Sequence, residues 1–258
     1  MIKLTFLGTG TSHGVPMIAC DCRICTSTDP RNHRTRTSAF LQYNDRCVLI
    51  DTPQEHRIQA IRNRIARVDA LLFTHTHADH IHGLDDVRRY SQISKAPVPC
   101  YGTPATLDTI RRVFEYAFIE TPKGGGKPQI ALNPIDEDQP FQLFGIDVLP
   151  IPVLHGETPV LGFRFDGLAY VTDTNNIPPA SLERLKDLDV LVLDALRPRP
   201  HVTHYSIYQA LDVVDRLRPR QAYFVHMTHD LDHEETNAWL RTVMENVSLA
   251  HDGLTITA

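Results

Sequence analysis

One stretch of sixteen residues, LLFTHTHADHIHGLDD from Leu71 to Asp86, constrains this chain more than any other. It places four histidines and three aspartates directly behind an apolar run, Ala70–Phe73, which predicts a short buried strand. While the backbone stays extended beyond that strand, His75 and His77 project on the same side and can grip one divalent metal. A lone buried histidine is usually a hydrogen-bonded structural residue. Four within eight positions, beside an aspartate, favour a metal centre at the end of a strand.

A second metal and its ligands follow from the rest of the sequence. Asp79 and His80 are adjacent, so they point in different directions and suit another metal nearby. Three further residues of ligand type each end an apolar run, where the rim of a sheet would hold them: His155, Asp173 and His226. Taken singly, each could be a turn aspartate or a hydrogen-bonded rim histidine. Taken with the cluster, they complete the ligand sets of two metals.

Short strand-like runs alternate with amphipathic helical runs along the 258 residues, and no linker or internal repeat divides them. We therefore expect a single domain, 1–258, with two sheets between layers of helices. The predicted strands are Lys3–Leu7, Ser38–Tyr43, Cys47–Ile50, Ala70–Phe73, Val98–Tyr101, Phe144–Pro150, Leu161–Phe165, Leu168–Val171, Val190–Leu193, Ala222–Val225 and Leu254–Thr257. The predicted helices are Glu55–Ala66, Gly83–Ile93, Pro104–Ala117, Pro179–Asp187, Ser206–Leu217 and His233–Val247. Between Glu120 and Gln139 the glycine run Lys123–Lys127 favours a loop or lid over a phosphate cradle.

The motif H-x-H-x-D-H, followed in order by His155, Asp173 and His226, resembles the metallo-β-lactamase superfamily over essentially the whole chain. The resemblance implies an α/β (α+β) fold, the four-layer αββα metallo-β-lactamase sandwich, with a dinuclear centre at one edge. It implies that one metal is held by His75, His77 and His155, and the other by Asp79, His80 and His226. Asp173 would bridge the two. Asp51, which follows the apolar run RCVLI, would orient a ligand; a turn or capping aspartate is the alternative.

A separate cluster, CDCRIC, places three cysteines in a C-x-C-x2-C array: Cys20, Cys22 and Cys25. Thiols this close suit a tetrahedral zinc that lacks a fourth ligand, which His229 would supply. Three reactive thiols, or an iron–sulfur site with a further partner, are the alternatives. The odd total of five cysteines fits a reducing compartment. Cys47 and Cys100, within or at the end of apolar strands, are expected in the core.

The start LTFLGTGTSHGVP, the cysteine array, H-x-H-x-D-H and the late H-x-x-H together are similar to the phosphoribosyl cyclic phosphodiesterase family of phosphonate degradation. That resemblance implies one structural zinc beside a catalytic pair of manganese or zinc ions. The same proteins are related to the tRNA 3′-processing endonuclease, whose long basic arm has no counterpart of that size in this sequence. The residues after Asp51 read TPQEHR, where a glycine-containing turn is expected. The substrate therefore does not follow from the resemblance alone.

The implied mechanism needs both a nucleophile and a proton donor. Two divalent metals about 3.5–4 Å apart lower the pKa of a bridging water and give a hydroxide near neutral pH. His204 matches the family position for the acid that protonates the leaving alkoxide, with His201 as its rival and a plain N-terminal helix residue as the alternative reading. We expect His204 and the metal ligand Asp79 to be the catalytic residues. Arg197 and Arg199 would bind a substrate phosphate or form a solvated turn.

Composition narrows the partners. A net charge of −5 gives no bulk basicity, so we expect a small phosphodiester substrate, not nucleic acid, and a structural role for the basic stretch Arg31–Ser38. No apolar run reaches the roughly 18–20 residues of a membrane span, and the N-terminus lacks a signal-peptide core, so no membrane partner and a cytoplasmic location are expected. A homodimer is left open beside a monomer.

These observations predict a metal-dependent hydrolase, with a phosphodiesterase for a small cyclic or ribose-linked ester as the leading reading. The alternatives are an RNA-processing nuclease, a thioester or lactone hydrolase, and a non-catalytic binding protein on the same scaffold. Loss of a metal ligand would favour the last of these, but all seven positions are filled. His/Asp ligation suits zinc, manganese and iron alike, so the catalytic metals stay open between manganese and zinc.

Overall fold

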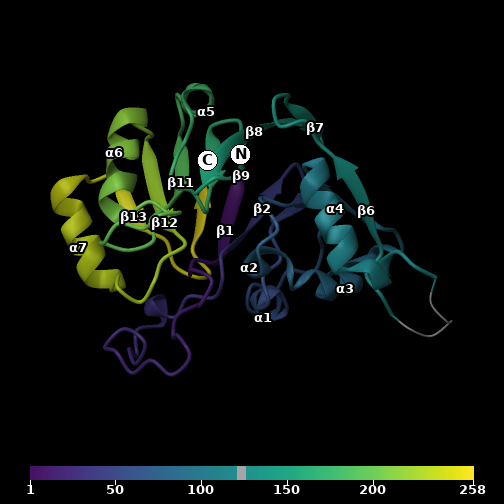
Figure 1. Ribbon diagram of the computed structural model, residues 1–258, viewed down its shortest axis with the longest axis horizontal. Helices are drawn as coiled ribbons and strands as arrows, with labels where there is room; N and C mark the ends of the chain where they lie inside the picture. The colour runs from purple at the N-terminus through teal and green to yellow at the C-terminus, as the bar shows by residue number, and fades with distance from the viewer. Residues whose placement is uncertain (121–125) are drawn as a thin grey trace.

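The computed structural model describes residues 1–120 and 126–258 of the chain. Two seven-stranded sheets lie face to face, and helices cover both outer faces, so that Figure 1 shows four layers side by side. The first sheet has the strand order β14-β1-β2-β3-β4-β5-β6, and the second β13-β12-β11-β10-β9-β8-β7. This is the αββα sandwich that the sequence predicts. The two chain termini lie close together at one end of the layers (Figure 1).

The strands of the first sheet are β1 Lys3–Gly8, β2 Ser38–Tyr43, β3 Arg46–Ile50, β4 Ala70–Leu72, β5 Val98–Gly102, β6 Ile130–Pro134 and β14 Thr255–Thr257. Those of the second are β7 Phe141–Leu143, β8 Ile146–His155, β9 Thr158–Phe165, β10 Leu168–Val171, β11 Val190–Asp194, β12 Gln221–Val225 and β13 Val247–Leu249. The α-helices are α1 His56–Arg62, α2 Ala78–Ile81, α3 Arg88–Ser94, α4 Pro104–Val113, α5 Pro179–Arg184, α6 Ile207–Leu217 and α7 His233–Val243. Short 3₁₀ turns occupy Pro30–Asn32, Leu84–Val87 and Glu115–Ala117.

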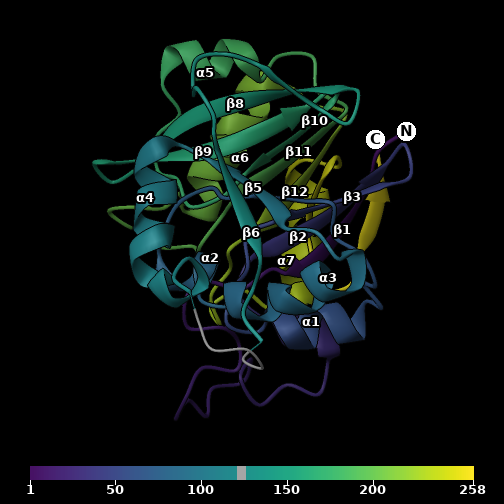
Figure 2. The ribbon, with the colours of Figure 1, turned by 90° about the vertical axis from the view of Figure 1, so that its right-hand side faces the viewer.

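Three apolar layers hold the sandwich together. The central layer lies between the sheets and includes Leu4, Phe163 and Val192, none of which is exposed. One outer layer packs α6 and α7 against the second sheet, and the other packs α3 and α4 against the first. Figure 2 views the molecule from the side on which α1, α3 and α4 cover the first sheet. Because both faces of each sheet are buried, the central strands read as continuous apolar runs.

Strand directions set the place of the candidate site. β3, β4, β5 and β6 run parallel in the first sheet, and β10, β11, β12 and β13 run parallel in the second. β8 is antiparallel to β9, which is antiparallel to β10, so β8 also points the same way as β10. The carboxyl ends of these strands therefore meet at one edge of each sheet, which is where open α/β sheets commonly place ligands.

The observed elements differ from the predicted ones mainly at short edge segments. Strands β6, β7 and β13 were not predicted, and helix α7 ends at Val243 because Met244 is extended and leads into β13. The predicted strand Phe144–Pro150 begins later, because Phe144 and Gly145 form a tight turn with positive φ between β7 and β8. The predicted helix Gly83–Ile93 begins as a 3₁₀ turn before α3.

Part of the predicted glycine-rich loop, Lys123–Lys127, lies outside the described residues, so its role as a loop or lid stays a prediction. Just after it, the chain forms β6 at the edge of the first sheet, inside the region predicted to be irregular. No helix among the described residues has the length and apolarity that a membrane crossing requires.

Candidate metal centre

Five strand ends supply the side chains of the site. β3 ends before Asp51, β4 leads to His75, β8 ends at His155, β10 leads to Asp173, and β12 ends before His226. Asp51, Asp173 and His226 all have positive φ, of 60°, 52° and 59°. Such a backbone is uncommon for residues other than glycine and turns the chain sharply at the end of the strand. The side chains are thereby directed into the space between the two sheet edges.

The carboxylate of Asp173 lies at the centre of the cluster. Its Oδ2 is 3.8 Å from Nε2 of His75, 3.3 Å from Nε2 of His80 and 3.2 Å from Nε2 of His226. Asp173 also belongs to two groups of residues, and within each group the possible ligand atoms all lie within 4.8 Å of one another. One set is Asp79, His80, Asp173 and His226, and the other is His75, His77 and Asp173. Asp173 belongs to both sets, as the predicted bridging position requires.

His155 extends the cluster on the side of His77. Its ring centroid is 5.1 Å from that of His77 and 5.9 Å from that of His75. All seven residues predicted as ligands therefore come together at one edge of the sandwich. His82, the fourth histidine of the opening stretch, is exposed and packs its ring against Phe114 instead.

Buried nitrogens without partners show that this arrangement suits cations. Nε2 of His75, His80 and His226 is buried and makes no hydrogen bond among the described residues. Burial lowers the pKa of the His75 imidazole well below its usual value. Burial also opposes protonation of His226, but the carboxylates of Asp173, Asp79 and Asp194 together outweigh it and raise the pKa of His226 to about 9. The site attracts positive charge, and imidazole nitrogens beside a carboxylate are a fitting donor set for divalent metals.

Further residues orient the candidate ligands. Asp51 is fully buried, accepts hydrogen bonds from the amide (2.9 Å) and hydroxyl (2.7 Å) of Thr74, and lies 2.7 Å from Nδ1 of His80. Nδ1 of His155 lies 2.8 Å from the carbonyl oxygen of Thr203. These contacts leave Nε2 of each ring for the cluster, as is usual for metal-binding histidines. Asp51 has the contacts of an orienting residue, the first of the two readings of its sequence position.

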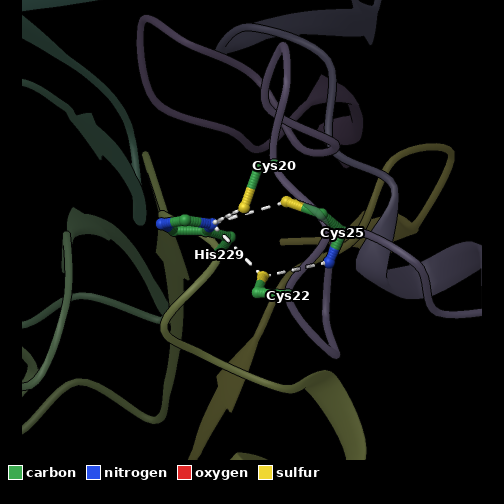
Figure 3. A group of neighbouring side chains, drawn as sticks. All are labelled: Cys20, Cys22, Cys25 and His229. Atoms are coloured by element: carbon green, nitrogen blue, oxygen red, sulfur yellow. Dashed lines mark hydrogen bonds between the residues drawn. The ribbon is translucent and has the colours of Figure 1, made fainter.

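The cysteine cluster forms a second, separate group (Figure 3). Nδ1 of His229 lies 3.2 Å from Sγ of Cys20, 3.4 Å from Sγ of Cys22 and 3.4 Å from Sγ of Cys25. Zinc bonds of about 2.3 Å to sulfur and 2.0–2.1 Å to nitrogen at tetrahedral angles separate such atoms by about 3.5 Å. The four side chains thus have the separations of a tetrahedral zinc site.

The thiols of this cluster differ in acidity. A hydrogen bond from the backbone of Cys25 lowers the pKa of Cys22 to about 6, whereas burial raises the pKa of Cys25 to about 11. Cys100 is buried in the first sheet and Cys47 is half-buried, as expected for core residues, and all five cysteines are free.

Comparison with known proteins agrees with this geometry. Residues 46–227 match the family model described as the beta-lactamase superfamily domain. The chain belongs to the β-lactamase superfamily. A crystal structure of a new diphosphatase from the PhnP family is 44% identical to this chain, covers 99% of it and 96% of its own length, and has a TM-score of 0.91. This superfamily member therefore has the metallo-β-lactamase fold of metal-dependent hydrolases, a fold that implies divalent metal ions.

Two curated relatives extend the comparison. An octanoyltransferase of Porphyromonas gingivalis is 34% identical over 256 residues, which cover 98% of this chain and 51% of the relative, so the chain spans about half of that protein. A ribonuclease Z of Mycobacterium bovis is 26% identical over 238 residues, which cover 83% of this chain and 77% of the relative. The matches to a PhnP-family protein and to a ribonuclease Z agree with the branch that the sequence favoured.

His204 lies against the candidate metal ligands of this superfamily member. Its ring stacks on that of His226, with centroids 4.6 Å apart, and its Nδ1 is 2.7 Å from Oδ2 of Asp194. The ring is only 8% exposed. The rival His201 lies farther out, with its ring centroid 5.2 Å from that of His204 and its Nδ1 near the Thr203 hydroxyl. The geometry favours His204 over His201 for contact with a bound substrate.

Asp194 is the residue that the sequence reasoning missed. It ends strand β11, is fully buried, and also accepts a hydrogen bond of 2.9 Å from the amide of Thr174. Its signal was present, since VLVLD ends an apolar run in an aspartate just as the runs before Asp173 and His226 end in ligand-type residues.

The basic residues near the site divide into two groups. The guanidinium group of Arg34 is almost fully buried and donates to the carbonyl oxygens of Thr228 (2.9 Å) and Leu231 (2.6 Å), which gives the stretch Arg31–Ser38 the structural role predicted for it. Arg197 donates weakly to nearby carbonyl oxygens, and the exposed Arg199 lies 3.7 Å from Asp230. Whether these two bind phosphate stays a prediction.

Proposed function

We propose that this chain is a metal-dependent phosphodiesterase that cleaves a small cyclic or ribose-linked phosphodiester. The observation that carries the proposal is the buried pair His204–Asp194 beside the metal cluster. Hydrolysis of an ester with a good leaving group needs no separate acid, whereas expulsion of a sugar alkoxide does. The similarity to a PhnP-family diphosphatase also supports chemistry at phosphorus.

The donor set fits two divalent ions, manganese or zinc. His75, His77 and His155 would hold one, and Asp79, His80 and His226 the other, with Asp173 between them. When bound, such ions supply Lewis-acid activation of water and neutralise charge that develops on the phosphoryl oxygens. Cys20, Cys22, Cys25 and His229 would hold one structural zinc.

The protein's own groups would then orient and transfer a proton. The contact with Asp194 fixes Nδ1 of His204 as the donor toward the carboxylate, so that Nε2 is directed to the reacting centre. Nε2 of the ring held in this way would give a proton to the leaving oxygen. Asp51 performs the same orienting task for His80.

An RNA-processing nuclease is the second candidate, because ribonuclease Z proteins are among the relatives. Such an enzyme should bind RNA with a strong salt dependence, which arises from contacts with many phosphates. A net charge of −5 argues against it. A thioester or lactone hydrolase would use the same metal centre without needing His204.

The test combines metal analysis with a substrate screen. Protein purified without chelators, from medium supplemented with metals, should carry about three ions per chain, two at the histidine cluster and one at the cysteines. It should hydrolyse phosphodiesters in preference to thioesters and lactones. One ion or fewer per chain, or preference for a thioester, would contradict the proposal.

A further inference from the structure

A groove leads away from the metal centre on the side of His75 and His77. It has a volume of about 520 Å³ and lies between the first turns of α4, the start of β9 and the loop from β6 to β7. A second hollow of about 420 Å³ shares Thr103, Pro104 and Glu137 with it and continues outward. Figure 2 views the side of the molecule on which α4 lies. We call the two hollows together the threonine groove.

Threonine is the commonest residue type in the lining of the larger hollow, beside apolar residues such as Pro104 and Val160. Its threonines are Thr74, Thr76, Thr103, Thr106, Thr109 and Thr158. Four of them already bond within the protein: Thr74 to Asp51, Thr103 to Thr106, and Thr109 to Arg112. Thr76 is partly exposed and Thr158 is exposed, and their hydroxyls are left for a ligand. A hydroxyl can donate and accept, which suits a sugar or another alcohol.

The charges of the groove are unsuited to phosphate. Among the described lining residues, Glu137 is the only acidic residue of the larger hollow. Asp136 joins it in the second hollow, and neither hollow is lined by Lys or Arg. The amino end of α4 does not compensate, because Pro104 has no N–H and the Thr103 hydroxyl caps the amide of Thr106 at 3.2 Å. A phosphate would therefore meet negative charge without a counterion.

The groove and His204 lie on different sides of the cluster. Of the described residues, His75 and His77 line the groove, whereas His155, with its ring centroid 4.5 Å from that of His204, does not. The leaving oxygen must lie next to the proton donor, and the attacking and leaving oxygens are roughly in line at phosphorus. The substituent that remains on phosphorus is then directed toward the groove.

We infer that the threonine groove binds the sugar or nucleoside that stays esterified to phosphorus, and that Glu137 selects against polyanions such as RNA. This inference rests on the proposed function. The opening of the site then has basic residues on one side and acidic residues on the other. Arg197 and Arg199 lie in the loop that carries His204, and Asp136 and Glu137 lie beside α4.

The first arm of the test compares two esters that share a leaving group. Thymidine 5′-(p-nitrophenyl phosphate) places a nucleoside in the groove, whereas bis(p-nitrophenyl) phosphate does not. Thr158→Val removes a hydroxyl with little change in shape and should raise KM for the thymidine ester about 3–10-fold, the worth of one hydrogen bond, with kcat kept. Hydrolysis of bis(p-nitrophenyl) phosphate should stay within about twofold. Equal effects on both esters, or none on either, would overturn the inference.

The second arm tests the charge. Glu137→Lys should strengthen inhibition by a ten-nucleotide RNA about tenfold or more at low salt, and the gain should shrink as salt is added. The control is Asp215→Lys on α6, which makes the same charge change outside the groove lining and should leave inhibition almost unchanged. Equal gains from both variants would mean that net charge alone acts.

Wild-type protein that cleaves neither ester would refute the phosphodiesterase and the role of the groove with it. Cleavage of both esters, with Thr158→Val unaffected, would refute the role of the groove alone.

Discussion

The histidine cluster and the cysteine cluster are two candidate metal sites built in opposite ways. The histidine cluster draws on the ends of strands in both sheets, between Asp51 and His226, and all its ligand residues except the exposed His77 are buried. The cysteine cluster draws on a single irregular loop, Cys20–Cys25, and one histidine from a distant part of the chain. Figure 3 shows that loop converging on His229.

This contrast assigns different tasks to the two sites. Strands with buried faces position the histidine cluster without needing a metal, so metals bound there would be available for the reaction. The irregular loop has little apolar packing of its own, with only Val15, Ile24 and Cys25 buried in its small cluster. There the metal would supply binding energy that the loop cannot obtain from packing.

The sharpest way to break the comparison is a pair of substitutions three residues apart. His226→Ala should lower hydrolysis of phosphodiesters by about 10³-fold or more, because it removes several kcal/mol of charge stabilisation, while the zinc at the cysteines is kept. His229→Ala should release that zinc and change the rate less than about tenfold. Metal content and initial rates of both variants measure this. Equal losses of activity would show that the two clusters act as one unit.

The next largest effect concerns the proton donor. General acid catalysis contributes about 10²–10⁴-fold, so His204→Ala should lose that factor on a ribose-type phosphodiester. On bis(p-nitrophenyl) phosphate, whose leaving group departs without help, the loss should be far smaller, with metal content unchanged. Similar losses on both substrates would instead assign His204 to metal binding or positioning. Loss on neither would move the acid to His201.

A residue of the site was predictable when the sequence around it carries a recognisable pattern. His75 to His80 were found because they are close together in the chain, and Asp173 and His226 because each ends an apolar run. Asp194 carries the same signal, but the predicted strand Val190–Leu193 stops one residue before it. The contact of His155 with Thr203 was beyond sequence reasoning, because a backbone carbonyl has no residue-type signature.

The fold shows the same division. The central strands were predicted because burial on both faces makes them apolar throughout. The edge strands β6 and β7 are short and half-exposed, and β6 ends in Pro134, so their formation depends on neighbours that a local pattern does not reveal. The predicted helix His233–Val247 extends to the first residue of β13, because no glycine or proline separates α7 from that strand.

A smaller effect on activity is expected from the two aspartates that orient histidines, Asp51 beside His80 and Asp194 beside His204. Asp51→Asn should weaken metal binding or activity about 10–100-fold, because it replaces the acceptor that orients His80. Asp194→Asn is the matched control, since it disturbs His204 and should reduce turnover without weakening metal affinity. Chelator competition separates the two variants. A loss of metal affinity in Asp194→Asn would show that the two aspartates are not distinct in function.

The smallest effect on catalysis, and the one that tests the cysteine loop directly, is expected from Cys22→Ser. The substitution should abolish tight zinc binding and lower stability by about 2–3 kcal/mol, which for a chain of this size lowers Tm by about 5–10 °C. Phosphodiester hydrolysis well below the melting range should stay within about threefold. The control is Cys47→Ser, which removes a thiol of the first sheet and should leave the zinc in place.

The acidity of the same thiol gives the direction of a pH effect. Because the pKa of Cys22 is lowered to about 6, this ligand is a thiolate above that pH and takes up a proton below it. Zinc stabilisation should therefore be greatest above the ordinary thiol pKa of 9.0, decline as the pH falls toward about 6 and be lost below it, since protons and zinc compete for the sulfur. Tm measured from pH 8 to pH 5 should then fall more steeply for the wild type than for Cys22→Ser, which has no tightly bound zinc to release. Parallel curves for the two proteins would mean that the loop is held by packing alone, and the contrast between the two clusters would then disappear.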